Sequence, residues 1–288
     1  MKKRIALIIN PLVLRDNKKC RFLKRLIRLL RGHEIEMLVF QSPTELKSHL
    51  RSSRYDVICI AGGDGTLNCV INSLKDPGHI PISLIPLGTS NSFSKELNIS
   101  LDPLKIAAVI KGDRIRMVDM GVANGRRFIL VLGVGFDAMV CLNMRKMANC
   151  RYRGYFRYII PIIKAFRGYR VPKLHISVDG IKVKGGMAVI SNSRYYGWIF
   201  KVTDRARCDS GKLDICVFSA KSIWEFIIYS FFSSVGRLST TKGVGYLQGE
   251  EISIDSKIRC PFQIDGDFGG FVPINAYVIP QGIPFSVP

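Results

Sequence analysis

The stretch that decides the fold is Val57-Ile58-Cys59-Ile60-Ala61-Gly62-Gly63-Asp64-Gly65-Thr66-Leu67-Asn68. The apolar run at its start predicts a buried strand, and the glycines after it predict a tight turn. A helix is expected to begin behind the turn. Backbone N–H groups and the helix N-terminus then point at one place, which suits a phosphate. Glycine also allows a ligand to approach the backbone closely.

Asp64 is the unusual residue of this turn. A bare carboxylate repels a polyphosphate, so the arrangement makes chemical sense mainly with Mg²⁺ between the two charges. The alternative is an ordinary strand-to-helix turn in which Asp64 caps the helix. The pattern favours the first interpretation, in which Asp64 holds the metal. The residues expected to cradle the phosphates are Gly62, Gly63, Gly65 and Thr66.

A second strand-to-turn pattern lies one helix downstream, at Ile82-Ser83-Leu84-Ile85-Pro86-Leu87-Gly88-Thr89-Ser90-Asn91-Ser92-Phe93-Ser94. In an open parallel sheet both turns leave the carboxyl ends of strands, where ligands bind. We therefore expect Gly88, Thr89 and Asn91 to line the same pocket as the first turn. The alternative is that Asn91 or Ser92 only caps the following helix.

Together the two motifs resemble the catalytic domain shared by diacylglycerol kinases, sphingosine and ceramide kinases, and soluble bacterial lipid kinases. That family shows GGDGT and then P-x-G-T-x-N-[DS]-[FL]-A; this chain has GGDGT at 62–66 and PLGTSNSF at 86–93. The resemblance extends along most of the chain, since three later segments match in the same order: Val118–Gly121, Cys208–Asp214 and Gln263–Asp267. NAD kinases also carry GGDGT, but their second motif differs.

The resemblance implies phosphoryl transfer from ATP, with Mg²⁺, to a lipid hydroxyl. Asp265 matches the first carboxylate of the family's D-G-E segment and is the expected general base. Asp267 stands in place of the Glu, one methylene shorter, and is the expected nucleotide contact. Asp119 is the second candidate for the metal network of Asp64, although it could equally be a surface charge. The alternative for Asp265-Gly266-Asp267 is a plain turn.

The chain departs from the family pattern at two loops. The family often shows N-P-x-[SA]-G after the first strand, whereas here Asn10-Pro11 is followed by Leu14 in place of the Gly. Asn10 remains a candidate nucleotide contact. In the segment that resembles D-D-G-x-L-D, Ser210 replaces the second Asp. Asp209 is then the candidate left for a structural metal, and one carboxylate makes a poor site for a hard cation.

From residue 5 to about 120, strand-like runs alternate with helical segments. This alternation predicts a doubly wound α/β domain with a parallel sheet. We expect strands at 5–10, 35–40, 56–61, 82–86 and 116–121, and helices near 18–31, 43–52, 66–74 and 91–110.

After Gly121 the pattern changes to strands with turn signals, at 127–134, 174–179, 182–191, 213–219, 246–255 and 259–264. Helical inserts are expected near 137–148, 155–167 and 222–235. The fold class expected is an α/β, NAD-kinase-like nucleotide-binding domain over 1–121 and a mostly antiparallel β-sandwich, which takes the lipid, over 122–274. The resemblance implies that a last strand near 275–288 returns to the first domain.

Composition excludes several classes of protein. The chain has 288 residues, 47% of them hydrophobic, enough for one large or two ordinary cores. Eight scattered cysteines form no Cys-x-x-Cys pair, so we expect reduced core thiols in a cytoplasmic protein. Four isolated histidines show no metal-ligand spacing. We expect no secretory signal, and the longest charge-free runs are too short to span a bilayer.

The formal net charge of +21 indicates a polyanionic partner. No nucleic-acid motif stands out. We therefore expect a lipid substrate at an anionic membrane surface and a cytoplasmic protein bound peripherally to that membrane. A homodimer stays open at this point. One segment interleaves basic and aromatic side chains, which suits a membrane interface as well as an ordinary surface. Its basic residues are Arg145, Lys146, Arg151, Arg153 and Arg157.

Three functions stay open at this point. A lipid kinase is favoured by the two motifs together. A nicotinamide-dinucleotide kinase would use the same GGDGT turn on another class of substrate. A non-catalytic relative that binds lipid or nucleotide would account for the altered first loop and Ser210. The sequence does not name the lipid, because diacylglycerol, phosphatidylglycerol and sphingoid bases all present a hydroxyl near an interface.

Overall fold

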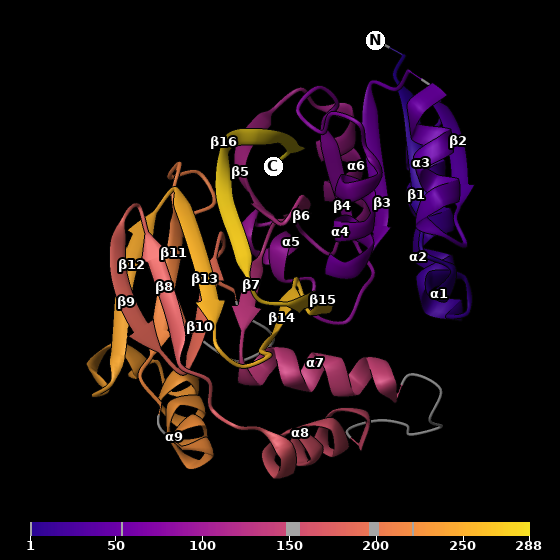
Figure 1. Cartoon of the computed structure of the whole chain (residues 1–288). Helices are drawn as coiled ribbons and strands as arrows, with labels where there is room; N and C mark the ends of the chain where they lie inside the picture. The colour runs from indigo at the N-terminus through magenta and orange to yellow at the C-terminus, as the bar shows by residue number, and fades with distance from the viewer. Residues whose placement is uncertain (1, 53, 148–155, 196–201, 221) are drawn as a thin grey trace. The chain divides into compact units, whose positions relative to one another are not determined.

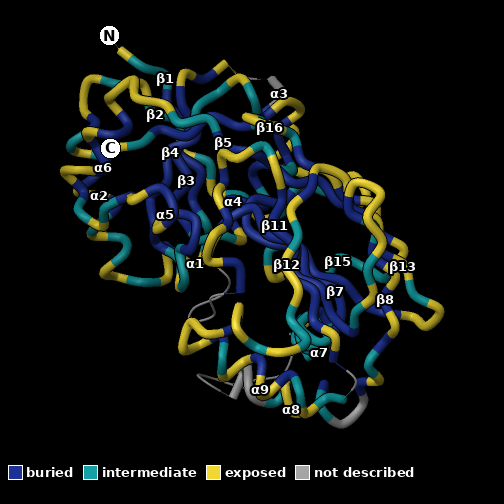
Figure 2. The backbone as a smooth tube through the Cα atoms, turned by 90° about the vertical axis from the view of Figure 1, so that its left-hand side faces the viewer, coloured by how far each residue is buried: buried dark blue, intermediate teal, exposed yellow. Residues whose placement is uncertain are grey.

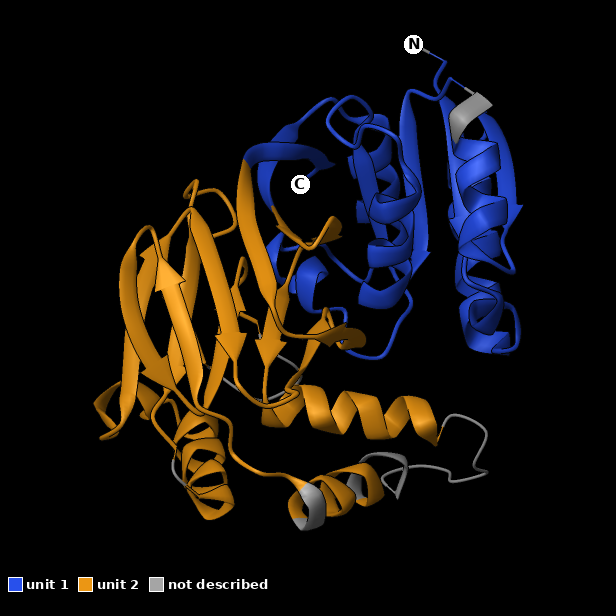
Figure 3. Ribbon diagram, in the orientation of Figure 1, with its two compact units in different colours: residues 1–120, 280–288 blue, residues 121–279 orange. Residues whose placement is uncertain are grey.

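The computed structural model (Figure 1) describes residues 2–52, 54–147, 156–195, 202–220 and 222–288. The chain divides into two compact units, which Figure 3 shows in two colours. The first unit comprises Met1–Met120 and Pro280–Pro288, and the second comprises Gly121–Ile279. Each unit has its own sheet structure and core.

A parallel sheet forms the centre of the first unit, with strand order β2-β1-β3-β4. Every residue of β3 and β4 is buried. Continuous apolar strands of this kind are typical of a parallel sheet covered on both faces. The strands are β1 (Arg4–Ile9), β2 (Glu34–Val39), β3 (Val57–Gly62) and β4 (Ile82–Pro86), as the sequence predicts.

Helices cover both faces of this sheet. From β1 the chain moves one way along the sheet to β2, and then the other way to β3 and β4. Right-handed crossovers therefore place α2 on one face and both α3 and α4 on the other. In agreement, α2 contacts α6, and α3 contacts α4. The doubly wound fold is confirmed, with α2 (Asn17–Leu29), α3 (Pro43–Ser52), α4 (Asp64–Ser73) and α6 (Pro103–Lys111).

The single helix expected over 91–110 is wrong, because two helices lie there. Helix α5 (Ser92–Glu96) ends before Asn98, which has a φ of +56°. Helix α6 then begins with Pro103 in its first turn, and the Asp102 carboxylate accepts the Leu104 N–H at 3.0 Å. A proline and a capping Asp are start signals, so they mark a second helix. A short helix, α1 (Pro11–Leu14), was not expected.

The second unit contains two antiparallel sheets packed as a sandwich. Six strands follow the order β12-β11-β10-β7-β14-β15, and β8, β9, β13 and the first part of β16 form the other layer. Side chains from both layers share one core that includes Leu132, Ile190, Ile176 and Ile254. Strands β7, β10, β11 and β14 are buried along their whole length, as Figure 2 shows in dark blue for β7. The β-sandwich is confirmed.

The bounds of its first layer are β7 (Val131–Val134), β10 (Met187–Ser191), β11 (Leu213–Phe218), β12 (Val244–Gly249), β14 (Pro261–Ile264) and β15 (Asp267–Phe271). The other layer has β8 (Leu174–Val178), β9 (Ile181–Gly185), β13 (Glu251–Ser256) and β16 (Ile274–Ser286). Its edge includes β5 (Ile115–Ala123) and β6 (Arg126–Phe128). The helices are α7 (Phe136–Lys146), α8 (Phe156–Gly168), α9 (Ile223–Ser234) and the 3₁₀ turn Leu238–Thr240.

Three of the expected strands are wrong in their extent, because each is two strands. The runs 127–134, 182–191 and 246–255 split into β6 and β7, β9 and β10, and β12 and β13. In each pair the chain passes from one sheet of the sandwich to the other. The corner at Ile129-Leu130 leaves the apolar run unbroken, so the sequence does not reveal it; at the other two corners the sequence does offer a break, Gly185-Gly186 and Gly249-Glu250.

Two strands run through both units. The first residues of β16 pair with β13 in the second unit, and Phe285 near its end pairs in parallel with Ile82 of β4 in the first unit. Strand β5 likewise begins in the first unit and pairs with β6 in the second. The chain after residue 279 is therefore part of the first unit.

Candidate active site

Strand register brings the two glycine turns of the first unit to the same edge of its sheet. Gly62 at the end of β3 is opposite Pro86 at the end of β4, and Ile9 of β1 is opposite Ala61. The turns after these strands, together with Asn10, therefore leave the sheet at its carboxyl edge. This is the edge at which open α/β sheets bind ligands.

The two turns touch through their glycines. A Cβ on Gly88 would lie 2.3 Å from the Gly63 Cα, and a Cβ on Gly63 would lie 3.0 Å from the Gly88 Cα. The Leu87 N–H also donates to the Gly62 carbonyl at 3.0 Å. No other residue type fits at position 88 without moving backbone, so this glycine is required for the approach of one turn to the other.

Asp64 joins the first turn to the helix that follows the second. Its two carboxylate oxygens accept the backbone N–H groups of Ser92 at 2.9 Å and Phe93 at 3.1 Å, the first residues of α5. The residue thus caps a helix, but α5 rather than the helix α4 that it begins. A carboxylate has about four acceptor positions, so two remain for water or a metal ion.

Helix α4 presents the open N-terminus of this edge. Within the described residues no side chain caps it, because Gly63 occupies the N-cap position. The Thr66 and Leu67 N–H groups donate to the Gly63 carbonyl, so the N–H groups of Asp64 and Gly65 are the ones that can face solvent or an anion. Gly65 is exposed, and a Cβ on it would meet no described atom within 4 Å. The open side of the turn therefore faces space that a ligand can enter.

Three polar side chains that we expected to contact the nucleotide form hydrogen bonds within the turns instead. They belong to Asn10, Thr66 and Asn91. The Asn10 amide donates to the buried Thr66 hydroxyl at 2.9 Å, and its oxygen caps α1. Asn91, with a φ of +48°, accepts the Gly88 N–H at 2.9 Å and donates to the Pro86 and Gly88 carbonyls. Asn tolerates this left-handed conformation better than most residues. Thr89, in contrast, is exposed.

Asp119 is not a surface charge, since only 1% of its surface is exposed. Its Oδ1 accepts the Gln281 N–H at 2.9 Å, and both residues belong to the first unit. Gln281 has a φ of +49°, so the carboxylate holds a backbone conformation that is uncommon for this residue type. The surface interpretation of Asp119 is therefore wrong.

Asp265 lies in the turn between β14 and β15, with a φ of +49°. Its carboxylate accepts three backbone N–H groups, from Ile129 at 3.0 Å, Leu130 at 2.9 Å and Val131 at 2.8 Å. Its own N–H donates to the Val131 carbonyl at 2.8 Å. The residue is thus part of a turn, but one whose carboxylate is fixed by charge-assisted hydrogen bonds from another segment.

A pair of residues that the sequence did not single out supports this turn. The Gln263 side chain donates to Asp137 Oδ2 at 3.1 Å and accepts the Gly266 N–H at 2.7 Å. A Cβ on Gly133 would overlap Asp137, so a glycine is needed there. The signal available in the sequence was the Gly133-Val134-Gly135 run just before Asp137, at the start of the helix expected near 137–148.

The remaining acidic candidates face basic side chains. Asp267 Oδ2 lies 3.3 Å from an Arg126 guanidinium nitrogen. Asp209 Oδ1 lies 3.2 Å from Arg207 Nε, while the Ser210 hydroxyl bonds to backbone within the same loop. Among the described residues, no group of three or more His, Cys, Asp or Glu side chains could hold a metal ion.

Three of the thiols, those of Cys141, Cys216 and Cys260, are held in the protonated form by burial. Seven of the eight cysteines lie in described segments, and none of these seven forms a disulfide. Burial, with a smaller contribution from the negative charge of Asp137, raises the pKa values of Cys141 and Cys260 to about 12. Burial also raises the pKa of Cys216 to about 12. These thiols stay protonated at neutral pH, so they are inert.

The basic and aromatic segment falls largely outside the described residues, since 148–155 is not described. The predictions for Arg151 and Arg153 are therefore left open, and the Arg157 side chain is also outside the description. Arg145 lies in the last turn of α7, with its guanidinium carbon 5.6 Å from the Phe268 ring centroid. In the described parts of the chain, no helix has the length and apolar character needed to cross a bilayer.

Two family models match the chain, one after the other. The diacylglycerol kinase catalytic domain matches residues 4–123, and the YegS C-terminal NAD kinase beta sandwich-like domain matches residues 131–286. Among known proteins, the diacylglycerol kinase of Staphylococcus carnosus strain TM300 is 27% identical over 299 aligned positions. The alignment covers 100% of this chain and 96% of that protein.

Solved structures agree on the fold. A diacylglycerol kinase from Bacillus anthracis str. Sterne has a TM-score of 0.74 at 19% identity, over 100% of this chain and 98% of that one. An NAD kinase from Archaeoglobus fulgidus in complex with ATP has a TM-score of 0.56 at 13% identity, over 98% and 93%. The two models match successive parts of the chain, residues 4–123 and 131–286, so together they show that the chain belongs to the diacylglycerol kinase family and is a lipid kinase.

Proposed function

We propose that this kinase transfers the γ-phosphate of ATP to a hydroxyl of a membrane lipid. The observation that carries the proposal is the contact of two glycine turns at the carboxyl edge of the first unit's sheet, beside the open N-terminus of α4. Backbone N–H groups and a helix dipole there favour a phosphate chain. The lipid hydroxyl is the acceptor class that the family implies.

In this proposal the nucleotide phosphates lie against Gly62, Gly63 and Gly65, with Gly88 and the exposed Thr89 beside them. Asn10, Thr66 and Asn91 act mainly by holding the turns in shape, because their side chains are bonded within them. Phosphoryl transfer needs little covalent chemistry from the protein, so positioning and charge stabilisation carry most of the rate. Turns fixed before the nucleotide arrives meet that need.

Mg²⁺ fits one part of this edge. Asp64 would hold it, directly or through water, with the oxygen positions that α5 leaves free. Mg²⁺ commonly takes one or two carboxylates, substrate phosphates and water, so a single Asp is a sufficient protein ligand. When bound, the ion neutralises charge on the transferred phosphoryl group. Asp119 would act as a positioning residue rather than as a metal ligand, since its carboxylate bonds to the Gln281 backbone N–H. Asp209 remains a weak candidate beside Arg207.

Asp265 is the proposed general base for the lipid hydroxyl, and the residues that bond to it hold its carboxylate in one orientation. Gln263 and Asp137 support that orientation from the other side of the turn. Asp267 is the proposed nucleotide contact in the same turn, with Arg126 as its partner in the absence of ligand. The +21 charge supports action as a peripheral protein on an anionic cytoplasmic membrane surface.

The experiment that tests the function offers the protein two classes of acceptor. Purified enzyme with Mg²⁺ and isotopically labelled ATP is incubated with a total lipid extract in detergent micelles, and separately with NAD. We expect labelled phospholipid by mass spectrometry and no labelled NADP. Labelled NADP without labelled lipid would overturn the proposal in favour of an NAD kinase. Absence of both products would leave a non-catalytic relative and equally overturn it.

Asp265→Asn is the blank for that assay and a prediction in its own right. Loss of a positioned general base lowers kcat by roughly 10²–10⁴-fold. The affinity for ATP, measured by calorimetry, should stay within about threefold. An equal loss of ATP affinity would make Asp265 a ligand of the nucleotide or its metal.

Asp179→Asn is a matched control for the structural role of Asp265. Asp179 also has a positive φ, of +47°, and precedes a positive-φ glycine. Its carboxylate likewise accepts backbone N–H groups, from Glu250 and Glu251. Both variants should lower the thermal stability of the protein to a similar degree, whereas only Asp265→Asn should lower kcat. A similar loss of kcat in both would mean that the carboxylate of Asp265 is only structural.

A further inference from the structure

Helix α9 (Ile223–Ser234), labelled in Figure 1, presents two different apolar faces. One face is buried, with Phe226 3% and Tyr229 6% exposed. The opposite face is open to solvent, with Trp224 68% and Phe231 63% exposed. Its residues recur at the spacing of a single helical stripe. We call this stripe the α9 outer face; it consists of Trp224, Ile227, Ile228, Phe231 and Val235.

The buried face fixes the orientation of the helix. The Phe226 ring stacks on Phe136 of α7, with centroids 5.3 Å apart and planes within 9°. Phe136 in turn contacts Phe166 of α8 at 4.9 Å and Tyr169 at 5.6 Å. The Phe218 ring of β11 packs against Tyr229 at 5.2 Å. Because aromatic contacts secure one side of α9, its outer face is held outward from the second unit.

The α9 outer face carries no charge. The one charged residue in the helix, Glu225, forms a hydrogen bond with the Tyr229 hydroxyl, and burial above all raises the pKa of that tyrosine. Exposed basic side chains follow the helix directly, at Arg237 and Lys242. An apolar helix face with aromatic residues and adjacent basic side chains is typical of a helix that lies in a membrane interface.

Two occupants could cover such a face, a bilayer or a second copy of the chain. The net charge of +21 opposes the approach of two copies and favours an anionic surface. Trp and Phe partition well into the boundary between headgroups and acyl chains. The charge and these side chains therefore favour an anionic lipid surface as the occupant.

We propose that the α9 outer face inserts into the headgroup and upper acyl region of an anionic lipid bilayer. The inference rests on the proposed function, since that function supplies the reason for the protein to reach a membrane. It adds the surface that makes the contact, which lies apart in sequence from the basic segment 145–157.

Vesicle sedimentation tests this proposal without any need for turnover. Vesicles of phosphatidylglycerol and phosphatidylcholine are compared with vesicles of phosphatidylcholine alone. The variant Ile228→Ser/Phe231→Ser should lower the partition coefficient on anionic vesicles at least tenfold. The matched control Ile181→Ser/Tyr277→Ser removes two other exposed apolar side chains of the second unit, 58% and 46% exposed. It should bind within about twofold of wild type.

Tryptophan fluorescence gives a second readout with the folded wild-type face. The chain has two tryptophans, so Trp198→Phe leaves Trp224 as the single reporter. Its emission should shift to shorter wavelength on anionic vesicles, and brominated acyl chains should quench it. Unchanged emission together with equal binding of the serine variant would overturn the proposal.

Two further outcomes separate this inference from others. The first outcome concerns oligomeric state, measured by sedimentation velocity. A dimeric wild type and a monomeric Ile228→Ser/Phe231→Ser variant that bind vesicles equally well would make the α9 outer face an interface between copies. That result would overturn the proposal. A kinase assay on a short-chain, soluble lipid in the absence of vesicles tests the proposed function alone. If the enzyme phosphorylates the short-chain lipid and the Ile228→Ser/Phe231→Ser variant binds vesicles as well as wild type does, only the membrane role of the α9 outer face is overturned. Absence of turnover with α9-dependent binding overturns the function only.

Discussion

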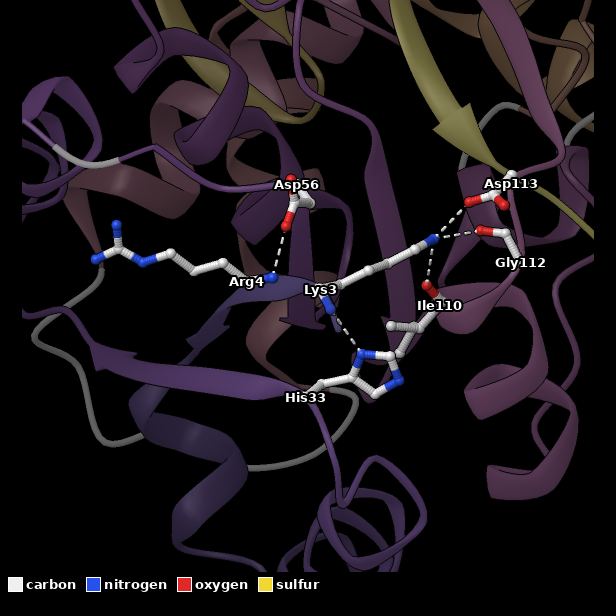
Figure 4. Close-up of polar contacts among 7 residues, drawn as sticks. All are labelled: Lys3, Arg4, His33, Asp56, Ile110, Gly112 and Asp113. Carbon is white, nitrogen blue, oxygen red and sulfur yellow. Dashed lines mark hydrogen bonds and ion pairs between the residues drawn. The ribbon is translucent and has the colours of Figure 1, made fainter. Parts of the chain in front are cut away.

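The two edges of the first unit's sheet use polar groups in opposite ways. At the amino edge, side chains and backbone close on one another (Figure 4). Lys3 Nζ donates to the Ile110 carbonyl at 3.3 Å, the Gly112 carbonyl at 2.6 Å and Asp113 Oδ1 at 2.9 Å, while its backbone N–H donates to His33 Nδ1 at 3.0 Å. The strand is thereby tied to the end of α6.

At the carboxyl edge the polar side chains satisfy neighbouring turns and leave the first turn of α4 open. Asp64 bonds to the N-terminus of α5 and Asn91 to its own turn, while no described side chain caps α4. The comparison shows that a polar cluster alone does not mark a functional site. What distinguishes the carboxyl edge is the uncommitted N–H groups beside glycines.

The largest effect should follow from Asp64→Asn. The amide keeps the size of the side chain but removes the charge that would hold Mg²⁺ and one of two acceptors for α5. We expect kcat/KM for the lipid substrate to fall by at least about 100-fold while the protein still folds, measured by steady-state kinetics and circular dichroism. Asp56→Asn at the amino edge, where that carboxylate accepts the Arg4 N–H at 2.6 Å, should leave kinetics unchanged. Near-normal turnover of Asp64→Asn with normal Mg²⁺ dependence would show that Asp64 does not hold Mg²⁺.

A smaller effect is expected from Gly88→Ala, which forces the two turns apart because its Cβ would lie 2.3 Å from the Gly63 Cα. The dissociation constant for ATP, measured by calorimetry, should rise at least about tenfold. Gly245→Ala is the control, since its Cβ would meet only the Val217 carbonyl oxygen, at 4.0 Å. Unchanged ATP affinity in Gly88→Ala would show that contact between the turns does not matter for binding.

Lys3→Met tests the hydrogen bonds at the amino edge of the sheet. It removes three hydrogen bonds from the ammonium group, so the free energy of unfolding should fall by about 1–2 kcal/mol. The KM for ATP should stay the same, because this edge faces away from the glycine turns along the same strands. Urea denaturation and steady-state kinetics measure the two quantities. A changed KM with little loss of stability would contradict the separation of roles.

The smallest effect concerns pH at the amino edge. Partial burial, then the charges of Lys111 and Lys3, hold the pKa of His33 below its usual 6.5. The folded protein therefore favours neutral His33, whose Nδ1 accepts the Lys3 N–H. This contribution to stability is complete above pH 6.5 and is lost as the pH falls from there through the folded-state pKa. On acidification the melting temperature should fall less in His33→Gln than in wild type. NMR titration of wild type should give a pKa of His33 below 6.5.

The sequence predicts β1, β3 and β4 well because each is a short apolar run with a glycine or proline at or just after its end, whereas β2 mixes Glu with apolar residues. It does not predict what Asp64 binds, because its partner Ser92 comes near only through the register of β3 against β4. The burial of Asp119 was likewise hidden, since the Gln281 backbone that it bonds lies in the last strand. In the second unit, β15 was missed because its Asp-Phe-Gly-Gly-Phe sequence has little β-propensity.

Helix α9 is a second case in which the sequence predicts an element but not its contacts. A run of ten uncharged residues, Phe226–Val235, predicts a helix, but a helix that is apolar all round does not tell which face is buried. The contact between Phe226 and Phe136 decides it, and these residues are far apart in sequence. Local patterns thus predict elements, whereas the chemistry of a site depends on contacts between them.

Hydrogen–deuterium exchange with and without ATP and Mg²⁺ tests the central claim most directly, because it reads both edges of one sheet in the same sample. If the phosphates bind the glycine turns, amide exchange should slow in peptides that span residues 62–67 and 87–93. Exchange in peptides that contain Lys3, His33 and Gly112 should stay the same. Protection at the amino edge, or none at either turn under saturating ATP, would contradict the account.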